Sequence, residues 1–123
     1  MLRRAYIKME TLRNLLAIIG QATGISPQAF ETDLKGGLPA ITYNFYRSVD
    51  NGAVAQYRLQ TRITAQSLAQ AMGIEKNLTD ALITVGDEYK ADCSIQSNGG
   101  GTLIDEETNY PQVINYFDIT TKH

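Results

Sequence analysis

The feature that most constrains the fold of this chain is a pair of alternating runs. They flank a turn, and the second run leads directly into a helical pattern. The first run extends from Ile41 to Phe45 and the second from Tyr57 to Ile63, and each alternates between apolar and polar residues. This alternation is typical of strands that bury one face and leave the other polar. The segment 38–64 is therefore predicted to be a β-hairpin that leads into an amphipathic helix.

The length of the turn sets the register of this hairpin, because residues directly opposite each other must share a face. A two-residue turn at Asn51-Gly52 would place Phe45 opposite Arg58 and would mix the two faces. A three-residue loop, Asp50-Asn51-Gly52, pairs Phe45 with Tyr57 and puts the glycine where a left-handed conformation is needed. We predict this register, and a longer loop with the same parity is the alternative.

Apolar residues at helical spacing predict two helices on either side of the hairpin. The first contains Met9 to Ile19 and stops at Gly20. The second has an apolar stripe from Leu68 to Val85, begins after a cap at Thr64 or Ser67 and ends at Gly86. Between the first helix and the hairpin, Ser26-Pro27 could start a short helical turn.

The last third of the chain reads as β-structure. Residues 91–96 and 113–119 alternate as strands do, and the Asn98-Gly99-Gly100-Gly101 run between them is predicted to be a turn or flexible loop. Neighbouring strands with few helices imply an antiparallel sheet. We predict one α+β domain over residues 1–123, with an antiparallel or mixed sheet of about four to five strands and two main helices packed on one face.

Composition excludes several classes of function. The 123 residues suit a single domain, and a net charge of −2 gives no general attraction to nucleic acid or to anionic lipid. Cys93 is the only cysteine and His123 the only histidine, so we expect Cys93 to be a buried structural thiol. The apolar stretch Leu15–Ile19 is too short for a secretory or membrane-spanning segment. We expect no catalytic group, cofactor or metal site.

Two groups of charged residues are candidates for contacts between subunits. They are a basic group, Arg47, Arg58 and Arg62, and an acidic group, Asp105, Glu106 and Glu107. A hydrated sheet face is the simpler explanation of the basic group, because the second run lacks the stacking aromatics of a nucleic-acid platform. The acidic group lacks the alternate spacing of a calcium loop, so a solvated loop is expected there. A contact between the two groups of neighbouring subunits is suggested by charge alone.

Three segments resemble the tail terminator, or tail-completion, proteins of long-tailed bacteriophages and prophages. They are the helix at 12–20, the strand entry "Pro-x-Ile-x-Tyr" within 37–43, and the strand 57–63 that leads at once into a helix rich in Ala and Leu. The final alternating run, 113–119, is similar to the closing strand of that family.

The resemblance implies an α+β subunit that assembles into a ring, typically a hexamer, at the end of a tail tube. Its partners would be copies of itself, the tail tube and the head connector, with no membrane and no sequence-specific nucleic acid. Its place would be the virion, at the head–tail junction, after assembly in the host cytoplasm. The Asp50–Gly52 tip and the Gly99–Gly101 loop are candidate contact elements. Another head–tail connector component remains an alternative.

A small-ligand-binding or enzymatic α+β domain is the alternative from another class. It would need a pocket between sheet and helices, with a buried carboxylate at its centre. Asp80 or Asp118 would have to supply that group, although both are predicted to face solvent.

Overall fold

The computed structural model describes residues 2–30, 37–50, 54–87 and 93–122, which form two helices and five strands. In chain order these are α1 (Leu2–Thr23), β1 (Gln28–Ala29), β2 (Ala40–Asp50), β3 (Val54–Thr64), α2 (Leu68–Asp87), β4 (Ser94–Ile104) and β5 (Pro111–Lys122). The strands form one sheet in the order β1-β2-β3-β5-β4, in which β1 pairs with β2 in parallel and the other pairings are antiparallel. The predicted α+β class is confirmed, with the mixed form of the sheet.

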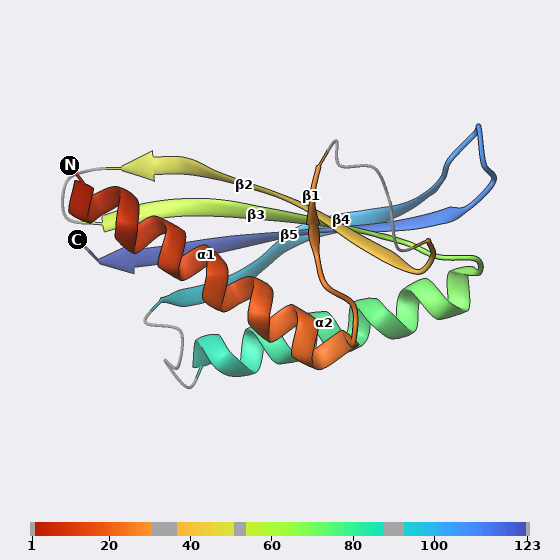
Figure 1. Cartoon of the computed structure of the whole chain (residues 1–123), viewed down its shortest axis with the longest axis horizontal. Coiled ribbons are helices and arrows are strands. Elements are labelled where there is room, and N and C mark those ends of the chain that lie inside the picture. Colours follow the sequence, from red (N-terminus) through yellow and green to blue (C-terminus); the bar gives the residue numbers. More distant parts are fainter. Residues whose placement is uncertain (1, 31–36, 51–53, 88–92, 123) are drawn as a thin grey trace.

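The two helices lie beside each other on one side of the sheet (Figure 1). Alternate residues of β3 and β5 point toward them, and Leu59 and Phe117 are fully buried at the centre of this layer. The helices contribute Leu15 and Leu82, which are also fully buried. The alternate residues that point away from the helices are mostly polar, so the sheet has one apolar and one polar face. Neither described helix is long and apolar enough to cross a bilayer.

The first helix ends later than its glycine suggested. Gly20 lies within α1, and the helix continues to Thr23, whose hydroxyl donates a hydrogen bond of 2.7 Å to the Ile19 carbonyl. Gly24 then adopts a φ of 74°, and its N–H donates to the Gly20 carbonyl at 2.9 Å. This left-handed residue after the last turn is the usual glycine stop, so the prediction of a stop at Gly20 was wrong.

The segment after Ser26-Pro27 is a strand, which corrects the predicted helical turn. Gln28 and Ala29 pair with Thr42 and Tyr43, and the N–H of Phe30 donates to the Tyr43 carbonyl at 2.9 Å. The open edge of β2 supplies backbone partners for this segment. A single helical turn would have no such partners, and short helices are marginally stable by themselves.

The hairpin has the predicted faces, but its register differs from the predicted one. Phe45 lies opposite Leu59, and Tyr43 lies opposite Thr61. The predicted pair, Phe45 and Tyr57, is diagonal, with ring centroids 5.1 Å apart. An irregularity between Arg47 and Val49 inserts an extra residue into β2. The bulge changes the pairing between itself and the turn, whereas the residues of β2 before it keep the faces that alternation predicts.

The glycine run lies inside a strand, which corrects the prediction of a loop there. Residues Asn98–Gly101 belong to β4, where the pairing with β5 shifts between Ser97 and Gly100. The actual hairpin connection follows at residues 105–110. Gly100 runs so close to β5 that an added Cβ would overlap the Ile114 carbonyl oxygen, so glycine permits this pairing.

The second helix starts as predicted but exposes part of its apolar stripe. The Ser67 hydroxyl accepts a hydrogen bond of 3.2 Å from the Gln70 N–H, which makes Ser67 the cap. Ala71, Leu78 and Leu82 are buried, whereas Leu68 and Met72 are 46% and 51% exposed. The start of α2 therefore lies outside the core, although its apolar pattern suggested that these residues would be buried.

Candidate interaction surfaces

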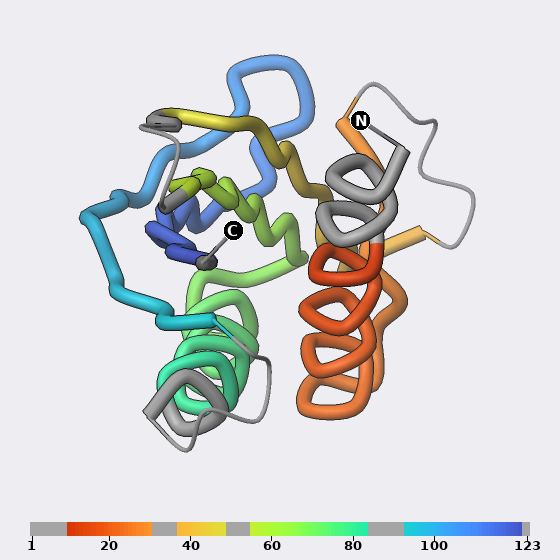
Figure 2. The backbone as a smooth tube through the Cα atoms, turned by 90° about the vertical axis from the view of Figure 1, so that its left-hand side faces the viewer, coloured from red at the N-terminus to blue at the C-terminus, as the bar shows by residue number. Residues whose placement is uncertain are grey.

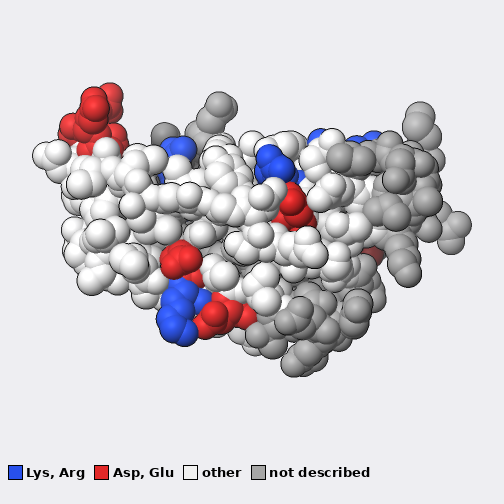
Figure 3. All heavy atoms as spheres, turned by 180° about the vertical axis from the view of Figure 1, so that it is seen from behind, with Lys and Arg blue, Asp and Glu red and all other residues white. Residues whose placement is uncertain are grey.

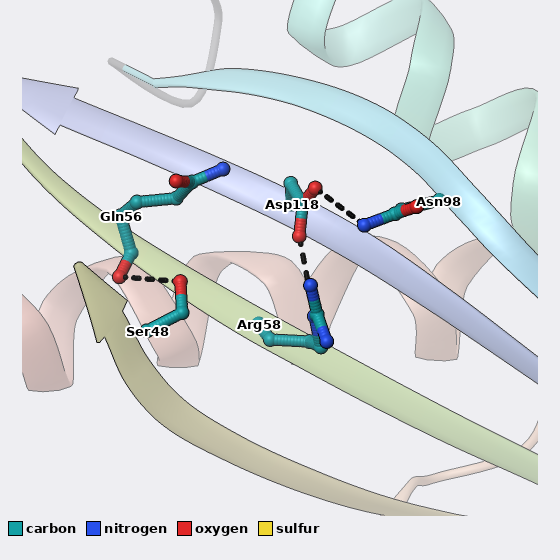
Figure 4. A network of polar contacts seen from close by, with 5 residues as sticks. All are labelled: Ser48, Gln56, Arg58, Asn98 and Asp118. Carbon is teal, nitrogen blue, oxygen red and sulfur yellow. Dashed lines mark hydrogen bonds and ion pairs between the residues drawn. The ribbon is translucent and has the colours of Figure 1, made fainter.

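A polar network crosses three strands on the sheet face that points away from α1 (Figure 4). Arg58 and Asp118 are direct partners in the β3–β5 register, and the Arg58 Nε donates to Asp118 Oδ1 at 3.3 Å. The Asn98 side chain donates to the other carboxylate oxygen at 2.8 Å. The bond to Asp118, and then one to Tyr46, raises the pKa of Arg58. Arg58 is therefore already paired within its own chain.

The three arginines of the basic group do not form one strip. Arg62 lies on the polar face with its guanidinium carbon 5.3 Å from the centroid of the Phe30 ring. Arg47 pairs in register with the buried Tyr57, so it projects on the other face of the sheet, 5.9 Å from the Tyr57 ring centroid. Only Arg58 and Arg62 share a face, and each is held by neighbours that the sequence spacing did not reveal.

The acidic group forms the tip of the β4–β5 hairpin. Asp105 is a turn residue, because its carboxylate accepts hydrogen bonds from the Glu107 N–H at 3.3 Å and the Thr108 hydroxyl at 2.9 Å. Glu106 and Glu107 are exposed. Acidic atoms gather at this corner in the space-filling view (Figure 3). The solvated acidic loop predicted from the sequence is thus a hairpin end with an ordered turn.

Exposed apolar residues flank this acidic tip. Leu103 is 43%, Ile104 64% and Tyr110 37% exposed. We call these three residues, together with Glu106 and Glu107, the tip surface. The hairpin projects at the end of the molecule where α2 begins (Figure 1). A local sequence signal for it exists in the Leu103-Ile104 pair directly before the acids, although alternation alone does not single out this pair.

The other predicted contact element is only partly described. Asp50 is the last residue of β2 and pairs through its backbone with Ala55. Asn51 and Gly52 lie outside the described residues. Asp50 therefore lies at the end of β2, level with the C-terminal part of β5, with β3 between them. The tip surface lies at the other end of the strands (Figure 1).

A pocket of about 380 Å³ opens between α1, β1 and β2. Its lining residues are Leu12, Ala29, Phe30, Tyr43, Asn44 and Phe45. Leu12, Phe30, Tyr43 and Phe45 supply apolar and aromatic side chains, Asn44 supplies a polar one, and polar atoms make up about half of the pocket surface. The volume lies in the range of sites for small ligands.

The two carboxylates considered for a catalytic role lie elsewhere. Asp118 is on the polar face in the network with Arg58 and Asn98, and Asp80 is 65% exposed on α2, 2.9 Å from the Lys76 ammonium. That hydrogen bond raises the pKa of Lys76. Within the described ranges, no three His, Cys, Asp or Glu side chains come together as metal ligands would. Cys93 is buried, as predicted.

The comparisons with known proteins give no family for this chain: no protein-family model matches it, and no curated protein matches it significantly.

Proposed function

We propose that this chain is a structural subunit of a phage or prophage, which assembles as a ring, caps the tail tube and helps to join the tail to the head. The observation that carries the proposal is the tip surface, an apolar and acidic hairpin end that projects from a compact α+β body. Exposed Leu, Ile and Tyr side chains beside charged residues are typical of contact surfaces between proteins. In this proposal the tip surface contacts the tail tube or the head connector.

The sides of the sheet are available for the contacts between copies that the proposed ring requires. A ring of identical subunits needs two different contact patches that close by rotation. The tip surface lies at one end of the strands, which leaves the sides of the sheet available for contacts between copies (Figure 1).

The first test is whether neighbouring genes encode capsid and tail-tube proteins; a tail-tube protein found there is then combined with this chain. We expect electron microscopy to show rings at the ends of tail tubes and tubes of uniform length when the chain is present. Ile104→Asp is expected to remove this capping, because it places a charge in the apolar part of the tip surface. Ala17→Asp, at an exposed position of α1, is the control and should cap normally.

Two results would overturn the proposal. One is a wild-type chain that neither binds tail ends nor limits tube length. The other is a genomic neighbourhood of metabolic genes without capsid or tail-tube genes.

The pocket beside α1 supports a second candidate function, the binding of a small apolar or aromatic ligand. Its lining of Leu12, Phe30, Tyr43 and Phe45 would hold an aromatic ring, and Asn44 could orient one polar group. Binding of aromatic fragments would shift the amide resonances of Ala29 and Asn44 in NMR spectra, and Leu12→Arg should abolish these shifts. If no fragment shifts these resonances, this candidate fails while the structural role stands.

A further inference from the structure

Both edges of the sheet have strand backbone that no neighbouring strand of the described chain pairs. β1 lies alongside only Thr42 and Tyr43, so the outer edge of β2 runs on toward Asp50 with no further strand in the described part of the chain. Asn44, Tyr46 and Ser48 are exposed along it. At the other side of the sheet, β4 is the last strand, and from Gln96 to Ile104 each of its residues is exposed. Figure 2 shows β4 at the margin opposite to α1 and β1.

The β4 edge lacks the usual charge and proline protection against pairing with another chain. Natural edge strands are commonly interrupted by charged residues or proline. From Ser94 to Ile104, β4 contains neither, and its irregularity between Ser97 and Gly100 is its one protective feature.

The two edges lie at the same level along the strands. The pairings form one continuous row across the sheet, from Tyr46 through Arg58 and Asp118 to Gln96. An edge of one copy can therefore meet the other edge of a second copy without a shift along the strand direction.

The strand directions also match. β2 is antiparallel to β3, β3 to β5 and β5 to β4, so β2 and β4 run in opposite directions. Rotation about an axis parallel to the strands keeps the direction of β2. The β2 strand of a rotated copy would then be antiparallel to the β4 strand of the first copy, which continues the alternation of the sheet.

We propose that the β4 edge of one copy pairs with the outer β2 edge of the next copy, near Gln96 and Tyr46, and so joins the sheets around the ring. This inference rests on the proposed ring. It uses two different patches, as a closed ring of more than two subunits requires. Main-chain hydrogen bonds would supply the contact, as when a strand is added to an open sheet edge.

Disulfide trapping tests this junction. Tyr46→Cys and Gln96→Cys are introduced into separate, differently tagged chains, which are mixed and mildly oxidised. Within one chain the two positions are three strand spacings apart, about 14 Å, so a bond inside a chain is excluded because it needs Cα atoms within about 7 Å. Cys93 is buried and remains in place. Ser94→Cys, used in place of Gln96→Cys, tests for a junction whose register is shifted along β4.

The expected product is a linked pair that contains one chain of each kind, and a ladder of higher multimers when both cysteines are in one chain. Dimers formed by Gln96→Cys alone would indicate a two-fold β4–β4 contact and would overturn the inference. Rings in native mass spectra without any cross-link in either register would also overturn it and would leave the ring itself intact. A wild-type chain that forms no ring, alone or with tail tubes, would overturn the ring as well.

A charge on the edge gives an independent test. Ser97→Lys adds a cation at an exposed position of β4, and Asn77→Lys adds the same charge at an exposed position of α2. Ser97→Lys should reduce the ring fraction strongly, whereas Asn77→Lys should leave it unchanged, with both variants equally folded by circular dichroism. Equal ring fractions in the two variants would contradict the proposed junction.

Discussion

Gly100 shows how one residue can decide the pairing of a strand. Its missing side chain lets β4 approach β5, and an added Cβ would lie 3.1 Å from the Cα of Asn115 as well as overlapping the Ile114 carbonyl. We expect Gly100→Ala to lower the free energy of unfolding by about 1–3 kcal/mol, the usual cost of overpacking. The measurement is urea denaturation, with a lower midpoint and an unchanged slope.

Gly101→Ala is the matched control for this prediction. An added Cβ at Gly101 would meet no atom within 4 Å. The midpoint of Gly101→Ala should therefore stay close to that of the wild type. Equal losses in the two variants would show that the close approach to β5 is not the cause.

Asp118 is the residue on which the polar network depends, because its two oxygens serve Arg58 and Asn98 separately. We expect Arg58→Met and Asp118→Asn to be non-additive in a double-mutant cycle, since both remove the same ion pair. The coupling should shrink at high salt, because the Arg58 side chain is 37% exposed. Strict additivity in urea titrations at low salt would contradict a stabilising pair.

At the scale of elements, α2 has a buried part and an exposed beginning that the apolar pattern does not separate. Leu82 is fully buried, whereas Leu68 is 46% exposed on the same helix. Leu82→Ala is expected to cost about 2–5 kcal/mol of unfolding free energy, because it leaves a cavity in the core. Leu68→Ala should cost no more than about 0.5 kcal/mol, as surface substitutions do. Comparable losses in thermal or urea unfolding would show that the start of α2 is also packed.

The hairpin illustrates what periodicity does and does not specify in an element. Alternation correctly assigned the faces of β2 and β3, since a wrong parity would have put arginines in the core. It could not locate the irregularity after Arg47, where the Ser48 hydroxyl donates to the Gln56 carbonyl at 3.1 Å. Ser48 is the extra residue of this irregularity, and the spacing of the apolar residues gives no sign of it.

At the scale of the whole molecule, the order of the strands predicts a gradient of protection against hydrogen exchange. β3 and β5 are central and have neighbours on both sides, whereas β4 is an edge. We expect the slowest amide exchange in β3 and β5 and faster exchange in β4 in the isolated chain. On ring assembly, amides of β4 and of the outer part of β2 should gain protection, and those on the exposed side of α2 should not. Unchanged exchange in β4 within the ring would contradict an edge-to-edge junction.

The candidate surfaces were only partly accessible from the sequence. The charged residues of the tip were found because a run of acids is visible locally. The pairing of Arg58 with Asp118 and the contact of Arg62 with Phe30 join residues far apart in the chain, so local patterns did not reveal them. The edge position of β4 depends on the order of strands in the sheet, which alternation does not encode.

The sequence by itself determined the elements whose residues alternate or recur regularly: both helices, the buried faces of β2, β3 and β5, and the α+β class. These follow from the periods of helix and strand, which each segment carries locally. The tertiary structure alone decided that residues 28–29 form an edge strand, that the glycine run lies within β4, and that Leu68 and Met72 are exposed. The physical reason is that backbone pairing and burial depend on which neighbour offers unpaired groups or surface, and such neighbours are brought together only by the complete fold.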